Sequence, residues 1–479
     1  MKTDLLADRH IGIQEADLPA MLEKIGVKSL DELINKTIPS KIRLKEPLAL
    51  AAPMTEREFA EHIAGLASLN KIYTSYIGMG WYDTITPAVI QRNVFENPAW
   101  YTSYTPYQTE VSQGRLEALL NFQTVISDLT AMPLANCSLL DEATAAAEAA
   151  TMMYGLRSRD QQKKGTNVLF VDESIFPQNL AVIQTRVIPQ GMKIQVGNYK
   201  ELEFTPEIFA CIIQYPNASG SVEDYREFVE KAHAANCKVA VDADILSLAL
   251  LLPPGEWGAD IVFGSTQRLG IPLFYGGPSA AYFATRDEYK RNMPGRIIGL
   301  SKDKYGKICY RMALQTREQH IKREKATSNI CTAQALLATM AGFYAVYHGQ
   351  EGIKNIAKRI HSIATWLNKA LARLGYVQHN EIFFDTLRFS LPDHVSAQKL
   401  RTIALSKEVN LCYYDNGDVG FSIDETTDLK DVNLLLSIFS IAAEETMQEV
   451  TDIPEASSLN RDLRRRTSFL THEVFNLSL

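Results

Sequence analysis

The stretch that decides the fold runs from Lys238 to Pro278 and reads KVAVDADILSLALLLPPGEWGADIVFGSTQRLGIPLFYGGP. It contains two short strand-like runs, KVAV and DIVF, and each is followed by polar or small residues. The apolar run between them, ILSLALLL, falls far short of the ~20 residues that a membrane-spanning helix needs. We therefore read this stretch as part of a soluble α/β core.

The residues on either side of this stretch continue the pattern. Further strand-like runs are NVLFVDE (167–173), KIQV (193–196), FACIIQYP (209–216) and SAAYFAT (279–285). Segments of helical period separate several of them, including residues 142–157 and 222–237. Strands spaced by helices imply parallel pairing with both sheet faces covered, so we expect a mainly parallel α/β sheet.

Four regions follow from the changes in pattern along the chain. Apolar residues recur at three- and four-residue steps near the N-terminus, which predicts a helical arm over residues 1–72. A segment dense in Tyr, Gly and Pro (73–114) looks too irregular for a helix and opens the large domain, residues 73–330. A small α+β domain over residues 331–445 and a polar tail over 446–479 complete the prediction, with the arginines at 464–466 expected to be exposed.

Composition and charge exclude several classes of function. The 479 residues are 46% hydrophobic and carry a formal net charge of −7, which argues against a main role in binding nucleic acid. The two cysteines that are nearest in sequence, Cys309 and Cys331, are 22 positions apart, so no CxxC-type redox or zinc motif is present. The N-terminus lacks the apolar core of a signal peptide. We expect a reduced, cytoplasmic protein with no metal and no membrane segment.

Candidate chemistry lies at the ends of the two strands in the opening stretch, because parallel sheets bind ligands beyond the carboxyl ends of their strands. Asp242 and Asp244 end the first strand. A carboxylate there is what a pyridoxal phosphate enzyme uses to keep the cofactor ring protonated. A strand-end Asp that caps the next turn is the simpler alternative, and both readings stay open.

The second strand end lacks the group that such an enzyme needs. A lysine that forms a Schiff base would follow this strand, yet the chain reads Thr266-Gln267-Arg268 and has no lysine between Lys238 and Lys290. Neither a glutamine nor a protonated arginine can form that bond. The helix expected to receive a cofactor phosphate opens with Asp141 and Glu142, which would cap it and repel an anion. The fold suits the cofactor, but the site does not.

Several long runs closely resemble the N-terminal half of a known family, glycine dehydrogenase (decarboxylating), the P-protein of the glycine cleavage system. These runs are YTSYTPYQTEVSQGRLEALLNFQT, SLLDEATAAAEAATMM, GSTQRLGIPLFYGGPSAAYFA and MPGRIIGLSKDKYGKICYRMALQTREQHIKREKATSNICT. The resemblance extends from Arg9 to the tail and implies an aminotransferase-like fold. It also implies that the second half of the enzyme, on the same or a separate chain, holds pyridoxal phosphate on a lysine whose position here is taken by Gln267.

The resemblance also suggests what this half contributes. Its implied partners are the second half, the lipoylated H-protein, glycine and a further copy through dimerisation. Thr327, Ser328 and Asn329, expected at the start of the helix AQALLATMAG, would reach the phosphate of the partner's cofactor. An ordinary helix cap is the alternative. A Tyr-rich loop would line the channel for the lipoyl arm, or serve only to pack the two halves together; its residues are Tyr101, Tyr104, Tyr107, Gln108 and Gln113.

Three hypotheses follow. The first is a cofactor-free half of a glycine decarboxylase that is inactive alone. The second is an independent pyridoxal phosphate aminotransferase or desulfurase. The third is a scaffold whose partner needs none of its side chains.

Overall fold

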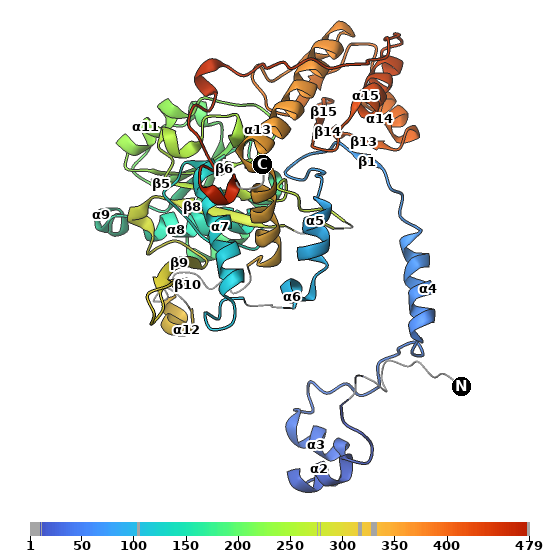
Figure 1. Ribbon diagram of the computed structural model, residues 1–479, viewed down its shortest axis with the longest axis vertical. Coiled ribbons are helices and arrows are strands. Elements are labelled where there is room, and N and C mark those ends of the chain that lie inside the picture. Colours follow the sequence, from blue (N-terminus) through green and yellow to red (C-terminus); the bar gives the residue numbers. More distant parts are fainter. Residues whose placement is uncertain are drawn as a thin grey trace. The chain divides into compact units, whose positions relative to one another are not determined.

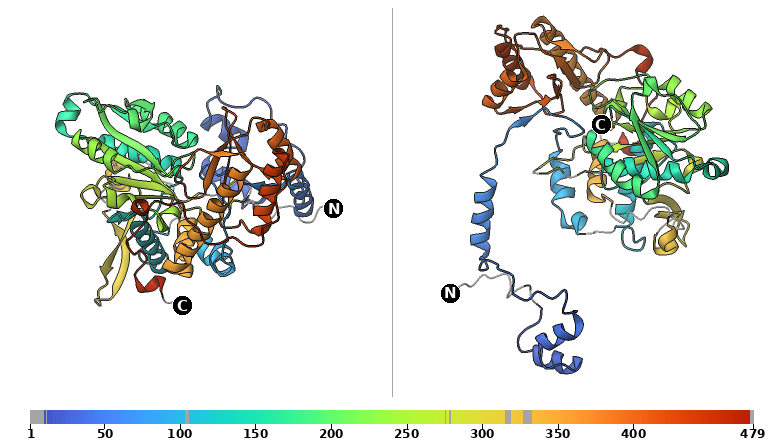
Figure 2. Two further views of the ribbon diagram at one scale, coloured as in Figure 1. Left: turned by 90° about the horizontal axis from the view of Figure 1, so that it is seen from above. Right: turned by 180° about the vertical axis from the view of Figure 1, so that it is seen from behind.

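The computed structural model describes residue 10 and residues 12–102, 106–274, 276–277, 279–314, 319–326 and 333–476 (Figures 1 and 2). The chain divides into two units, residues 1–73 and residues 74–479.

The first unit is helical, as its periodicity predicts. Its helices are α2 (Leu18–Ile25), α3 (Leu30–Thr37) and α4 (Glu56–Ala67). The Ser29 hydroxyl caps α3, and Thr55 and Glu58 form a reciprocal capping box at α4. None of the three helices buries a residue within this unit.

The second unit is built on a seven-stranded sheet with the order β2-β8-β7-β6-β5-β3-β4. The strands from β4 to β7 are parallel, and β8 pairs antiparallel with both β7 and β2. The prediction of a mainly parallel sheet is therefore confirmed. The strand bounds are β2 (Leu134–Ala135), β3 (Val168–Asp172), β4 (Lys193–Gly197), β5 (Ile208–Tyr215), β6 (Lys238–Ala243), β7 (Ile261–Ser265) and β8 (Ala281–Thr285).

Helices cover both faces of this sheet, which explains the continuous apolar strands (Figure 1). Val239 and Val241 pack into one core cluster together with residues of α7 and α13, whereas Ala240 between them packs with residues of α8 and α10. The helices around the sheet are α7 (Gln113–Thr130), α8 (Glu142–Gly155), α9 (Arg159–Lys163), α10 (Pro177–Val187) and α11 (Arg226–Ala234), whereas α12 (Gln319–Lys322) lies away from it (Figure 1). A hairpin of β9 (Ile297–Lys302) and β10 (Ile308–Ala313) forms a separate two-stranded sheet.

The segment expected to be irregular contains short helices. These are α5 (Ala88–Ile90), a π-helical turn (Gln91–Phe95) and α6 (Pro98–Tyr101). Proline precedes α5 and opens α6, and the Asn97 side chain caps α6. Proline at a helix start was misread as a sign of irregular chain.

A four-stranded antiparallel sheet with the order β11-β12-β15-β14 forms the C-terminal part of the second unit. Its strands are β11 (Val377–Gln378), β12 (Thr386–Ser390), β14 (Cys412–Tyr413) and β15 (Val419–Ser422). Its helices are α13 (Leu336–Arg373), α14 (Ala397–Ser406) and α15 (Leu429–Ala442), and α13 is kinked at Gly349. The short strands β1 (Thr74–Ser75) and β13 (Val409–Asn410) pair in parallel.

The tail is docked on the large domain, which corrects the expectation that the arginine run is wholly exposed. Leu463, Phe469 and Leu470 are buried, and Leu252 N donates to Leu463 O over 2.7 Å. The Arg465 guanidinium donates to the backbone oxygens of Asp128, Leu129 and Leu248 at 2.6–3.0 Å. Because Asp128 and Leu129 lie in the last turn of α7, Arg465 caps the C-terminus of that helix.

We expect Arg465→Ala to loosen the tail, because three carbonyls lose their donor at a cost of about 1–3 kcal/mol. Hydrogen exchange over residues 460–476 measures this effect and should become faster. Arg466→Ala is the matched control, since Arg466 is exposed and pairs with Asp462 along the surface. Equal exchange in the two variants would contradict the capping role.

No helix among the described residues has the length and apolar character needed to cross a bilayer.

Candidate functional site

A cleft opens at the carboxyl ends of β6 and β7, where parallel sheets bind their ligands. Its walls come from the strand ends, the start of α8, the loop before Tyr82 and the C-terminal domain, which contributes Asp385 and Thr386. The cavity that remains between these walls measures ≈ 30 Å³. Since one water needs about 10–15 Å³ by this measure, the cleft has room for about two waters.

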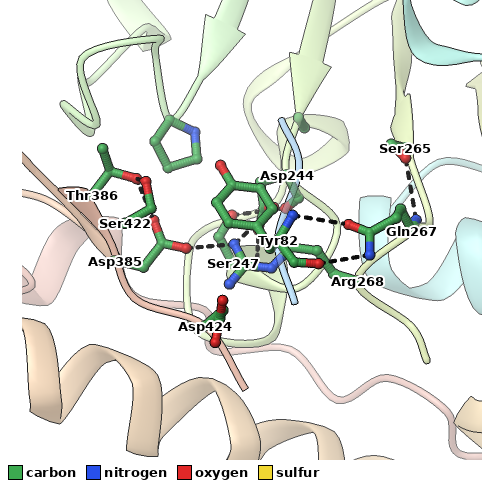
Figure 3. Close-up of polar contacts among 12 residues, drawn as sticks. Tyr82, Asp244, Ser247, Ser265, Gln267, Arg268, Asp385, Thr386, Ser422 and Asp424 are labelled. Carbon is green, nitrogen blue, oxygen red and sulfur yellow. Dashed lines mark hydrogen bonds and ion pairs between the residues drawn. The ribbon is translucent and has the colours of Figure 1, made fainter. Parts of the chain in front are cut away.

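Gln267 is fully buried and turned away from this cavity toward the backbone beside it (Figure 3). Its amide nitrogen donates to Tyr82 O at 2.7 Å and to Ile271 O at 2.8 Å. Its amide oxygen accepts from Tyr82 N at 3.2 Å. The side chain therefore joins two loops that are far apart in sequence, and it does so by donating two bonds and accepting one, which an amide can do and a lysine ammonium cannot.

Arg268 occupies the middle of the cleft and is 5% exposed. Its Nη1 lies 3.1 Å from Asp244 Oδ2 and also contacts Asp385 Oδ2. The Tyr82 ring covers the guanidinium at 3.9 Å from the ring centroid (Figure 3). Burial by itself would lower the pKa of Arg268, but the two carboxylates raise it, so the arginine stays charged.

Glu142 and Asp242 form a hydrogen-bonded carboxyl pair at the back of the cleft. Asn179 Nδ2 donates to Asp242 Oδ2 at 2.7 Å. Burial raises the pKa of Glu142 to about 7 and raises the pKa of Asp242 well above its usual value. Two adjacent carboxyls cannot both ionise at low cost, so the pair shares one proton near neutral pH.

The contacts of these carboxyl groups bear on the predicted caps at the start of α8 and after β6. Asp141 is the cap of α8, since its Oδ1 accepts from Thr144 N at 2.7 Å, as predicted. Glu142 is not a cap, because its carboxyl turns to Asp242. Asp244 does cap the next turn, accepting from Ser247 N at 2.7 Å, and it also pairs with Arg268.

The carboxyl pair makes stability depend on pH. The folded-state pKa values lie above those of the unfolded chain, so the folded protein holds an extra proton from about pH 4.5 to 7 and loses stability as pH rises through that window. In Glu142→Gln an amide donates to Asp242 at every pH. We expect its unfolding temperature to exceed that of the wild type by a margin that grows from pH 5 to pH 8, corresponding to roughly 1–2 kcal/mol.

Asp141→Asn is the control, because it removes a neighbouring carboxyl but keeps a capping oxygen. A constant difference between Glu142→Gln and wild type across pH 5–8 would show that no proton is shared.

The described residues of the proposed Tyr-rich loop lie on α6, on the turn before α7 and on the first turn of α7. Tyr101 is exposed, and Tyr107 is half-buried with its ring 4.3 Å from the Arg296 guanidinium. The Gln113 amide holds strand β10 through two bonds of 2.9 Å to the backbone of Tyr310. Gln108 is exposed, and Tyr104 lies outside the described residues.

The proposed phosphate loop also lies outside the described residues, since Thr327, Ser328 and Asn329 all fall in the gap before residue 333. Helix α13, which contains most of the predicted helix AQALLATMAG, begins at Leu336 with Ala335 in the capping position. Gln334 N bonds to Leu139 O at 3.4 Å, which places residues 333–335 against the segment that leads into α8. Arg323 and Lys325 are exposed.

Comparison with known proteins identifies the family. The family model described as "Glycine cleavage system P-protein" matches residues 8–439. The chain belongs to this family. It is 78% identical over 476 residues to glycine dehydrogenase (decarboxylating) of Bacteroides thetaiotaomicron and 55% identical to that of Flavobacterium johnsoniae. Each alignment covers 99% of this chain and 50% of the relative, so the chain spans half the length of these P-proteins.

Solved structures agree with this assignment. The crystal structure of an inhibitor-bound glycine decarboxylase (P-protein) matches with a TM-score of 0.78 and 30% identity, covering 89% of this chain and 98% of that one. The alanine–glyoxylate aminotransferase of Nostoc sp. matches with a TM-score of 0.53 at 15% identity, over 85% of this chain and 99% of that one, which supports the fold alone. The P-protein chain thus has the aminotransferase-like fold of pyridoxal phosphate enzymes.

The cofactor of that fold does not fit this cleft. The space beside Arg268 and Asp242 measures only ≈ 30 Å³, and the neighbouring cavity of ≈ 420 Å³ at the start of α8 is lined by Asp141 and Glu142, whose carboxyl groups do not suit a phosphate. Arg268 fills the centre, and Asp242, which could face a ring nitrogen, already faces Glu142. The sequence revealed the missing amine at Gln267 but gave no sign that Arg268, Glu142 and Asp385 fill the space.

Proposed function

We propose that this chain is the first, cofactor-free half of a glycine decarboxylase P-protein. The observation that carries the proposal is Gln267, an amide that is hydrogen-bonded to the backbone at the position of the expected lysine, beside a cleft that Arg268 occupies. The family match and the half-length coverage of glycine dehydrogenases support it. Pyridoxal phosphate is then held by the second half.

In the complete enzyme the second half removes carbon dioxide from glycine, and the aminomethyl group passes to the lipoyl arm of H-protein. Pyridoxal phosphate supplies the electron sink for that step. This half supplies architecture and, from the loop with Thr327, Ser328 and Asn329, donors to the phosphate of the partner's cofactor. The loop with Tyr101, Tyr104, Tyr107, Gln108 and Gln113 lines the lipoyl channel. We place the assembly, a further dimer, in the cytoplasm.

Two other functions make different predictions. An independent pyridoxal phosphate enzyme needs an amine where Gln267 stands, and the family match does not favour it. A scaffold without functional side chains differs from our proposal in one measurable result. It predicts that replacing Thr327, Ser328 and Asn329 by Ala leaves the cofactor affinity of the complex unchanged.

The test combines this chain with the second half of the Bacteroides thetaiotaomicron relative and measures carbon dioxide release from labelled glycine with lipoylated H-protein. We expect no release by either half alone and sustained release by the mixture. Release by this chain alone would overturn the proposal, and so would full activity of the second half alone. A borohydride-trapped cofactor peptide should map to the second half.

A further inference from the structure

A group of large apolar side chains lies exposed beside the cleft, on two segments that run alongside each other. Ile85 is 53% exposed, Val89 on α5 is 48% exposed and Phe274 is 63% exposed. Thr84 Oγ1 donates to Arg268 O at 3.2 Å, and Thr86 Oγ1 donates to Gly270 O at 2.7 Å, so the two segments are joined along their length. We call Trp81, Ile85, Val89 and Phe274 the 81–274 surface.

Close contacts hold two of the apolar side chains of this surface in place. Phe274 stacks on Phe95 with ring centroids 5.7 Å apart, and a side chain on Gly277 would collide with the Trp81 ring. Large apolar groups gathered on the surface of a soluble protein commonly mark a contact with another protein. An exposed segment that is already ordered binds without a large entropy cost, which suits a docking surface.

The order comes from buried polar residues of the cofactor-free cleft. Gln267 holds Tyr82 through both its backbone N–H and its carbonyl. Glu425 Oε2 accepts from Thr84 Oγ1 at 2.6 Å and from Ile85 N at 2.9 Å. The other oxygen of Glu425 accepts from Tyr344 OH at 2.8 Å, which fixes the carboxylate. Ile85 is therefore positioned from the large domain on one side and the C-terminal domain on the other.

We propose that the 81–274 surface is where the second half of the P-protein docks, and that Gln267 and Glu425 are positioning residues for it. The occupant follows from length, because the relatives carry a further stretch as long as this chain. The inference rests on the proposed function. The cleft then has a role that needs no cofactor. The amide of Gln267 orders the loop that contacts the second half, and the chemistry takes place in that second half.

The first experiment measures the dissociation constant between this chain and the second half by sedimentation. In Ile85→Asp/Val89→Asp two exposed apolar groups become charged, and we expect binding to weaken at least tenfold. Val377→Asp is the matched control, because Val377 is 64% exposed on β11 in the C-terminal sheet. It should bind like the wild type. A dissociation constant within twofold of the wild type for the double variant would overturn the proposal.

The second experiment tests positioning. Thr84→Val keeps the shape of the side chain but removes the hydroxyl that bonds to Glu425 and Arg268 O. We expect several-fold weaker binding, with recovery in Thr84→Ser, which restores the hydroxyl. Equal binding by Thr84→Val and Thr84→Ser would exclude the positioning role. Tight association of the wild-type halves without glycine turnover would contradict the proposed function but leave the docking surface standing.

Discussion

Arg268→Met is expected to destabilise the protein by about 3–5 kcal/mol at neutral pH. The substitution keeps most of the volume but leaves Asp244 and Asp385 without their cation, and Asp385 is buried. Burial raises the pKa of Asp385, and Arg268 opposes that rise. The loss should therefore shrink as pH falls and the carboxyls become protonated. Thermal unfolding at pH 5 and pH 8 measures both effects.

The control for this prediction is Arg226→Ala. Arg226 pairs with Asp224 on the surface, where both side chains are more than 40% exposed, and such pairs contribute little. A second variant, Arg268→Met/Asp385→Asn, removes one of the uncompensated charges and should recover part of the stability. If Arg268→Met unfolds like the wild type at pH 8, the ion pairs do not hold the cleft together.

Gln267→Lys is expected to fail as a restoration of the cofactor site. The new ammonium would be buried where an amide now makes three bonds, and Tyr82 N would lose its acceptor, at a cost of about 3 kcal/mol or more. Arg268 and Glu142 would still fill the cleft. We therefore expect a lower unfolding temperature and no covalent pyridoxal phosphate after borohydride treatment, as judged by mass spectrometry.

Gln184→Lys is the matched control, since Gln184 is an exposed residue of α10 and the same change there should leave stability unaltered. A stable Gln267→Lys protein that takes up the cofactor would show that the lysine was all that the site lacked. That outcome would contradict the interpretation of the cleft as closed.

Much of the architecture could be predicted from local pattern. The strand NVLFVDE forms β3, and the helix predicted from residue 142 is α8. Both follow because a strand or helix is set by the periodicity of neighbouring residues. The prediction failed where short helices begin at proline and where the tail docks through Arg465, since that arginine binds carbonyls some 217 to 337 positions away.

The site was predictable only in part, for the same reason. Glu142 reaches Asp242 across the sheet edge, and Arg268 reaches Asp385, which directly precedes β12 of the four-stranded sheet, from 117 positions away. Nothing in the composition of either segment indicates these pairings. Charged residues are usually solvated, and a sequence does not show which of them become buried together.

The sequence alone determined that this chain has no lysine between Lys238 and Lys290, and the Gln267 and Arg268 found there cannot form a Schiff base in any fold. Only the tertiary structure decided what the glutamine does instead. Its partner Tyr82 is 185 positions away, and the guanidinium of Arg268 beside it contacts the carboxylates of Asp244 and Asp385 from two distant parts of the chain. The side chain by itself decides whether a Schiff base can form. Its hydrogen bonds and buried ion pairs, in contrast, depend on which distant loops the fold brings together.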